Sequence, residues 1–96
     1  MKPSELLEAN RISIREIVSA HRGLNPRVFG SVVHGNDTED SDLDLLVDPT
    51  PDTSLLDIAK IQNRIQKLLG ISVDVLTPKA LPIKFRNSVL AEAEPV

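Results

Sequence analysis

Glycine, serine and carboxylate residues that could bind a nucleotide gather in one stretch, residues 29–48. Gly30 and Ser31 follow the apolar pair Val28-Phe29, which predicts a turn at the end of a strand where the backbone can approach a ligand closely. If a short helix begins after Gly30, its free N–H groups and the Ser31 hydroxyl point to one place, an arrangement suited to phosphate. We therefore expect a polyanion site at this turn, with Gly35 as a second position of close approach.

Two aspartates stand at the start of the next apolar run. Asp42 and Asp44 flank Leu43, and side chains two apart on a strand project from the same face. Two adjacent carboxylates repel one another unless a cation lies between them, and their hard oxygens favour Mg²⁺ or Mn²⁺. A phosphate-binding turn beside metal-binding carboxylates indicates phosphoryl or nucleotidyl transfer.

A third aspartate lies in a later strand. Residues 71–76 alternate between apolar and polar types, which predicts that Val73 and Val75 face the core and that Asp74 faces the other way. An isolated strand aspartate is usually solvated surface. Beside Asp42 and Asp44, however, we expect Asp74 to bind metal and to accept the proton of an attacking hydroxyl.

Two other ligand-binding motifs fail because residues that they require are absent. A calcium loop of the EF-hand type would begin at Asp37, but its sixth position is an aspartate instead of glycine, and its twelfth is Asp48 rather than glutamate. Gly30 and Gly35 have the spacing of a Walker A loop, yet Asn36-Asp37 replaces the required lysine and Ser/Thr. We reject both.

These features together resemble the signature of the DNA polymerase beta-type nucleotidyltransferase superfamily, specifically its minimal nucleotidyltransferase branch. The residues that carry the resemblance are Gly30-Ser31, Gly35, Ser41-Asp42, Asp44-Leu45 and Val73-Asp74-Val75. The resemblance covers nearly the whole chain. One departure is His34, since many relatives carry arginine just before the second glycine.

The resemblance implies transfer of AMP from ATP to a hydroxyl, that of a tyrosine on a partner protein. Catalytic Asp42, Asp44 and Asp74 would hold two Mg²⁺ ions, with Mn²⁺ as an alternative, while residues of the turns would bind the nucleotide. Those nucleotide-binding residues are Gly30, Ser31, Gly35 and Ser41, although a plain turn role is equally expected for Ser41. The implied partner is a HEPN-type ribonuclease toxin, to which this chain would be the antitoxin.

Two alternatives stay open. The chain could be a binding module, an antitoxin that neutralises its partner by contact with an idle site. It could also modify an antibiotic, although that reaction usually requires an acceptor-binding domain, which another chain would have to supply.

Length and composition favour one domain over residues 1–96. There is no cysteine, no apolar run long enough for a membrane span and no apolar signal core, so we expect a cytoplasmic protein. The net charge of −3, without any Trp or Tyr, disfavours nucleic acid as a direct partner. The sequence leaves the oligomeric state open.

The apolar periodicities predict an α/β (α+β) fold with a small mixed sheet, helices mainly on one face and the acidic site on the other. The expected helices span residues 4–22, with Ser4 as N-cap, about 55–69, and 82–91. The expected strands span residues 27–29, 43–47 and 71–76, with a turn at Asn25-Pro26 and a polar loop at 36–40.

The apolar residues of the last helix allow two interpretations. Phe29 and Phe85 stand in apolar settings that suggest the core. Ile83, Phe85 and Val89 would then complete the core, or else form a surface on which a partner docks.

Overall fold

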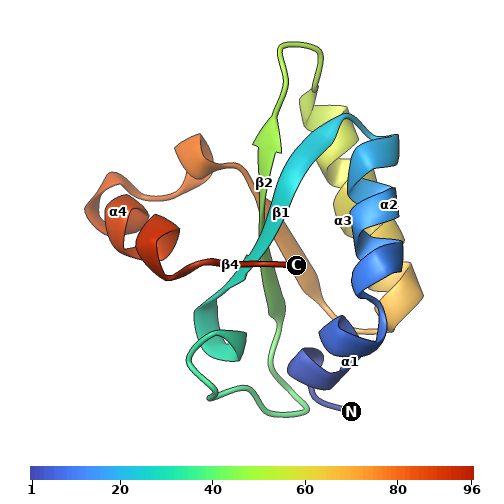
Figure 1. Cartoon of the computed structure of the whole chain (residues 1–96), viewed down its shortest axis with the longest axis vertical. Coiled ribbons are helices and arrows are strands. Elements are labelled where there is room, and N and C mark those ends of the chain that lie inside the picture. Colours follow the sequence, from blue (N-terminus) through green and yellow to red (C-terminus); the bar gives the residue numbers. More distant parts are fainter.

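The computed structural model describes residues 1–96 and contains a four-stranded mixed sheet (Figure 1). The helices are α1 (Pro3–Ala9), α2 (Arg11–Ala20), α3 (Leu55–Leu69) and α4 (Ile83–Glu92), and the strands are β1 (Gly23–Phe29), β2 (Leu43–Pro49), β3 (Val73–Leu76) and β4 (Glu94–Pro95). The 3-10 turns are η1 (Gly30–Val32) and η2 (Pro78–Ala80). The strand order is β3-β2-β1-β4, with β2 and β3 parallel and the other pairs antiparallel. The expected α/β class with a mixed sheet is confirmed.

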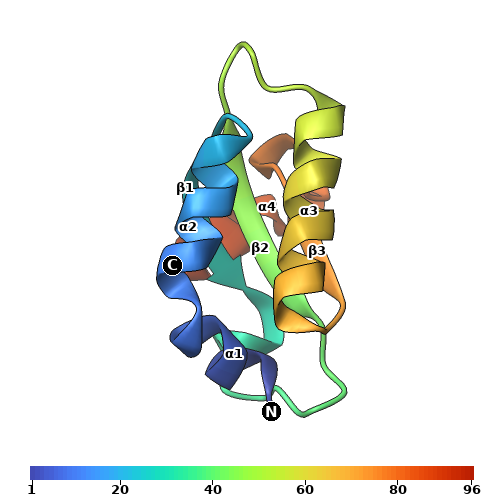
Figure 2. The same cartoon turned by 90° about the vertical axis from the view of Figure 1, so that its right-hand side faces the viewer.

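One face of the sheet carries the hydrophobic core under α2 and α3 (Figures 1 and 2). The strand side chains that fill it alternate along each strand, as predicted: Leu43, Leu45, Val47, Val73 and Val75 are all buried. The helices supply Ile14, Val18, Ile61 and Ile65, which are fully or almost fully buried. Burial of each such side chain contributes about 1.5–3 kcal/mol before the entropic cost of ordering it. The alternation leaves the polar strand positions on the opposite face.

Helix α3 connects β2 to β3, the crossover that a parallel strand pair requires. At its start the Ser54 hydroxyl accepts the Asp57 N–H (3.2 Å), and the Asp57 carboxylate accepts the Ser54 N–H (2.9 Å), a capping box. It ends at Gly70, which is left-handed (φ 71°), as the sequence predicted. No helix of the chain is both long and apolar enough to span a bilayer.

The single helix predicted over residues 4–22 is wrong, because the structure has two helices that meet at Asn10. The Asn10 side chain donates to the carbonyl oxygen of Leu6 (2.8 Å), and this local bond competes with a continuous helix. The N-cap is Lys2 rather than Ser4, since Pro3 occupies the first helical position.

The predicted turn at Asn25-Pro26 is also wrong. Both residues belong to β1, where the pairing with β2 shifts register between Leu24 and Arg27. Asn25 adopts a left-handed conformation (φ 51°), which asparagine tolerates, and proline is compatible with a bulge because it has no N–H to pair. The turn signal therefore marks an irregularity inside a longer strand.

The C-terminal segment crosses the other face of the sheet. Helix α4 was expected, but it lies on the side opposite α2 and α3 (Figure 1), and β4, which was not expected, pairs with β1. Phe85 is 54% exposed, so its assignment to the core is wrong, whereas Phe29 is partly buried. The η2 segment contacts β2 on this face, where Leu46 is fully buried.

Candidate active site

Asp44 and Asp74 stand side by side across the parallel pair of β2 and β3, since their Cα atoms are register partners. Each lies between two buried core residues of its strand, so both side chains project from the face opposite α2 and α3. Asp44 is partly buried and Asp74 is exposed. The sheet thus brings together two of the three aspartates selected from the sequence.

Asp42 belongs to the same electrostatic group. It is exposed and lies just before β2 begins at Leu43. Burial, followed by the charges of Asp74 and Asp42, raises the pKa of Asp44 from its ordinary value to about 6. The three carboxylates therefore repel one another, and a bound cation would relieve that repulsion.

The glycine turn meets this carboxylate group directly. Phe29 pairs with Asp44 across the β1–β2 ladder, so the next residue, Gly30, reaches the Asp44 side chain. Gly30 has a φ of 77°, and a Cβ there would collide with the Asp44 Oδ2 atom. Only glycine therefore leaves the Asp44 carboxylate in its place. This need for glycine is separate from the close approach to phosphate that the sequence predicted.

The short helix expected after Gly30 is present as the 3-10 turn η1, which begins one residue earlier, at Gly30 itself. The turn is closed by backbone hydrogen bonds from His34 N–H to the Gly30 carbonyl (3.2 Å) and from Asn36 N–H to the Ser31 carbonyl (2.9 Å). Ser31 therefore lies in a fixed turn next to the acidic group, as nucleotide binding there would require.

Gly35 and Ser41 occupy more peripheral positions. Gly35 has a φ of 71°, yet nothing lies within 4 Å of the place a Cβ would take. The left-handed backbone conformation therefore explains why glycine stands at position 35, and crowding by neighbouring atoms does not. The Ser41 hydroxyl accepts the Thr38 N–H (2.8 Å), which closes the loop before β2 and agrees with a turn role.

Two long-range contacts at the edges of the site were not predicted. The Asp37 carboxylate accepts the Ser4 N–H (2.9 Å), and this hydrogen bond lowers the pKa of Asp37. The His34 Nε2 atom lies 2.7 Å from a carboxylate oxygen of Glu92 in α4. The first contact ties the acidic loop to the start of α1, and the second ties the glycine turn to α4.

The carboxylates do not form a complete metal cage, since no three His, Cys, Asp or Glu side chains are grouped closely enough to hold an ion. Asp42, Asp44 and Asp74 nevertheless offer hard oxygen donors on one open face, and burial together with the charges of Asp74 and Asp42 raises the pKa of Asp44. This donor set fits Mg²⁺ or Mn²⁺ when a bound phosphate completes the coordination.

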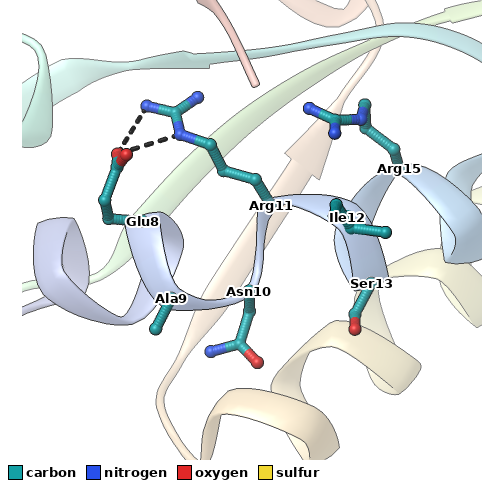
Figure 3. Close-up of a pocket in the computed structure, with 7 residues that line it drawn as sticks. All are labelled: Glu8, Ala9, Asn10, Arg11, Ile12, Ser13 and Arg15. Atoms are coloured by element: carbon teal, nitrogen blue, oxygen red, sulfur yellow. Dashed lines mark hydrogen bonds and ion pairs between the residues drawn. The ribbon is translucent and has the colours of Figure 1, made fainter.

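The measurable hollows of the structure lie away from the aspartates. One, of about 340 Å³, follows the junction of α1 and α2 (Figure 3). Its charged groups already have partners: Arg11 pairs with Glu8 (2.8 Å) and also donates to the Pro95 carbonyl (3.2 Å), and Arg15 donates to the Val96 carbonyl (3.0 Å). These contacts hold the C-terminal residues against α2. Because they occupy the charged groups of this hollow, the face that carries Asp42, Asp44 and Asp74 remains the candidate site.

Comparisons with known proteins identify the family of this chain. The nucleotidyltransferase domain family matches residues 11–95. Protein adenylyltransferase MntA of Thermococcus cleftensis is 40% identical over 65 residues, which cover 68% of this chain and 66% of that protein. A solved structure of a minimal nucleotidyltransferase superposes with a TM-score of 0.86 at 40% identity, over 97% of this chain and 95% of the other.

A toxin-antitoxin crystal structure with AMP-PNP shares the fold at 16% identity, with a TM-score of 0.75 over 90% of this chain and 71% of that one. The family match spans most of the chain and includes both the glycine turn and the three aspartates. This chain therefore belongs to the nucleotidyltransferase domain family, as a minimal nucleotidyltransferase.

Proposed function

We propose that this nucleotidyltransferase transfers AMP from ATP to a hydroxyl of a partner protein and acts as an antitoxin. The observation that carries the proposal is the pairing of Asp44 with Asp74 beside the Gly30 turn, which puts metal donors and a phosphate turn on one face. The relative named protein adenylyltransferase supports AMP as the group transferred. The toxin-antitoxin structure with AMP-PNP supports ATP as the substrate and a toxin as the partner.

In the proposed reaction, the turn holds the triphosphate with the backbone of Gly30 and Gly35 and the hydroxyl of Ser31. Asp42, Asp44 and Asp74 would hold divalent ions, two Mg²⁺ by the family resemblance, which neutralise charge around the attacked phosphorus when bound. The acceptor oxygen forms a bond to the α-phosphorus, and the bond from that phosphorus to the bridging oxygen breaks to release pyrophosphate. Asp74, the exposed member of the pair, accepts the proton of the acceptor hydroxyl.

The proposed acceptor is a tyrosine of a HEPN-type ribonuclease toxin. The aspartates lie on an open face, and none of the measurable hollows includes them. A small acceptor would have few side chains to hold it there, whereas a folded protein brings its own binding energy and presents its hydroxyl from outside. This open geometry supports a macromolecular acceptor.

The test is to incubate the purified chain with labelled ATP, Mg²⁺ and the product of the adjacent gene, which we propose is the toxin. We expect one labelled AMP group on a toxin tyrosine, located by mass spectrometry. Asp44→Asn should reduce transfer by about 100-fold or more, because it removes a donor from the reacting centre. Asp40→Asn is the matched control, because Asp40 is an exposed acid in the loop just before β2. Full transfer by an Asp42→Asn/Asp44→Asn double variant would refute the assignment.

A second candidate function is neutralisation of the toxin by contact alone. It is favoured by the absence of three acidic or histidine side chains grouped as a metal cage. The two candidates differ in one phenotype: the Asp44→Asn variant should fail to protect cells from the toxin if transfer is required, and should protect them fully if contact suffices.

A further inference from the structure

Helix α4 is held in place at both ends, although none of its residues is buried. Near its start, the Arg86 guanidinium donates to the carbonyl oxygens of Lys79 (2.9 Å) and Leu81 (3.0 Å). At its end, Glu92 bonds His34 (2.7 Å), and the next residues pair with β1. The helix is fixed in this way with one side only partly buried, which includes Val89 and Leu90, so its other side chains are presented to solvent in a defined orientation.

The side chains that α4 presents at its start are large and apolar. Ile83 is 84% exposed and Phe85 is 54% exposed. The Lys84 ammonium lies 5.6 Å from the centre of the Phe85 ring. Because folding leaves this apolar surface in water, covering it with another molecule releases free energy that the isolated chain does not gain.

The position of α4 connects this surface to the proposed reaction. α2 and α3 cover the core face of the sheet, and α4 lies on the side that carries Asp44 and Asp74 (Figures 1 and 2). Glu92 contacts His34, whose N–H closes the turn at Gly30. A protein seated on α4 would therefore approach the sheet from the side that carries the aspartates.

The charge of this segment indicates the kind of surface that fits it. Between Asp74 and Glu92 the chain carries Lys79, Lys84 and Arg86 and no acidic residue, whereas the whole chain has a net charge of −3. A partner with carboxylates around an apolar centre would match an apolar patch edged by cations. A surface rich in arginine or lysine would be repelled.

We propose that the exposed first turn of α4, where Ile83, Lys84 and Phe85 stand, is the docking surface for the protein acceptor. The acceptor's matching surface is apolar with an acidic rim and lies next to the hydroxyl that receives AMP. This inference rests on the proposed function, because it assigns the place at which the acceptor of that reaction binds.

The test measures binding and transfer separately, so that the two proposals can fail independently. Binding of the adjacent-gene toxin is measured by calorimetry without nucleotide, using the full chain and three variants. Ile83→Asp and Phe85→Ala should each weaken the complex tenfold or more, since each removes an apolar side chain that the complex would bury. Lys84→Glu should weaken it several-fold, with an effect that shrinks at high salt.

Leu55→Asp is the matched control, because Leu55 is 88% exposed on α3, which covers the core face. It should leave the toxin affinity unchanged, and all variants should keep the wild-type affinity for ATP with Mg²⁺ and the wild-type thermal midpoint. If Leu55→Asp weakens the complex and Ile83→Asp does not, the docking surface lies on the helical layer and the inference is wrong.

Two further outcomes also overturn the inference. One is the absence of any complex between the wild-type chain and the toxin. The other is a dimer of this chain, seen by light scattering, that Ile83→Asp dissociates, because the occupant of α4 would then be a second copy. A complex that depends on Ile83 but transfers no AMP would support the docking surface and refute the proposed reaction.

Discussion

Asp44 of β2 is the register partner of Asp74 of β3, so the fold places two carboxylates side by side on one face of the sheet. Folding raises the pKa of Asp44 to about 6, through burial first and then the charges of Asp74 and Asp42. In the metal-free protein the carboxylates therefore repel one another at the place where we propose that the nucleotide and its metal bind.

The first prediction concerns stability and pH. Because the pKa of Asp44 is raised on folding, the folded state binds a proton more tightly than the unfolded chain. The resulting stabilisation is fully present below the ordinary pKa of 3.8 and is lost as the pH rises through about 6. A two-unit shift corresponds to about 3 kcal/mol, which solvent screening of this partly exposed group reduces to about 1 kcal/mol.

Asp44→Asn should remove this pH dependence. Urea unfolding in EDTA at pH 3 and pH 7.5 measures it, and the stability of the variant relative to the wild type should be about 1 kcal/mol greater at pH 7.5 than at pH 3. Asp52→Asn, in an exposed loop, is the control and should keep the wild-type profile. An unchanged pH profile in Asp44→Asn would show that the pKa of Asp44 is not raised by folding.

The second prediction compares two left-handed glycines. Gly35→Ala should cost about 1 kcal/mol of stability, because only the backbone is strained. Gly30→Ala should cost more and should also abolish ATP binding, since the new methyl group displaces the Asp44 carboxylate. Thermal unfolding and calorimetry with ATP and Mg²⁺ test both. Equal effects of the two changes on ATP affinity would show that the contact with Asp44 is unimportant.

The third prediction concerns metal removal. The aspartate group should repel a triphosphate, so we expect ATP binding to weaken at least tenfold when EDTA replaces Mg²⁺. Asp74→Asn should reduce the difference between the two conditions, because it lowers both the metal affinity and the repulsion. Calorimetry gives the affinities directly. Equal ATP affinity with and without metal would exclude a metal bridge.

The fourth prediction concerns the contribution of the Ser31 hydroxyl to ATP binding. Ser31→Ala removes one neutral hydrogen bond to phosphate and should weaken ATP binding by about 0.5–1.5 kcal/mol, roughly twofold to tenfold. Ser88→Ala, at an exposed position of α4, is the matched control. A Ser31 variant that binds ATP like the wild type would remove its hydroxyl from the phosphate site.

The fifth prediction concerns the acidic loop. Asp37→Asn replaces a charged acceptor of the Ser4 N–H with a neutral one and should cost about 1 kcal/mol at pH 7. Since the pKa of Asp37 is lowered on folding, its contribution is present above 3.8 and is lost as the pH falls through the folded-state value. Asp40→Asn in the same loop is the control. If the stability difference between the variant and the wild type does not shrink as the pH falls, the charge is not the cause.

The sequence predicted the parts of the fold that depend on local patterns. The alternation around Asp44 and Asp74 identified two strands and the face each aspartate occupies, and the cap at Gly70 identified the end of α3. The break at Asn10 was missed because the apolar period continues through it, and only the side-chain bond to Leu6 interrupts the backbone.

Contacts between distant residues could not be predicted in this way. The bond from Asp37 to the start of α1 and the bond between His34 and Glu92 join side chains whose sequence neighbours give no hint of the partner. The same holds for the contact of Gly30 with Asp44, which depends on the register of β1 and β2. The position of α4 on the acidic side follows from the crossing of the chain after β3 and not from its weak apolar pattern.

The mixed pairing of the sheet divides the site into a local part and a distant part. The antiparallel pair of β1 and β2 brings the glycine turn and Asp44 together within one hairpin. Asp74 arrives only after α3 has crossed back to lay β3 parallel to β2. Contacts that close over short sequence separations form faster than those that close over long ones.

An interruption in the exposed loop at residues 50–53 would therefore separate the nucleotide turn from the last aspartate. Each fragment would carry half of the chemistry, and neither could complete it alone. Reassociation of the two fragments would have to rebuild the β2–β3 ladder. The amount of AMP transferred would then measure how much of the fold had assembled. The topology that builds this enzyme thus also makes it suitable as a split reporter of its own folding.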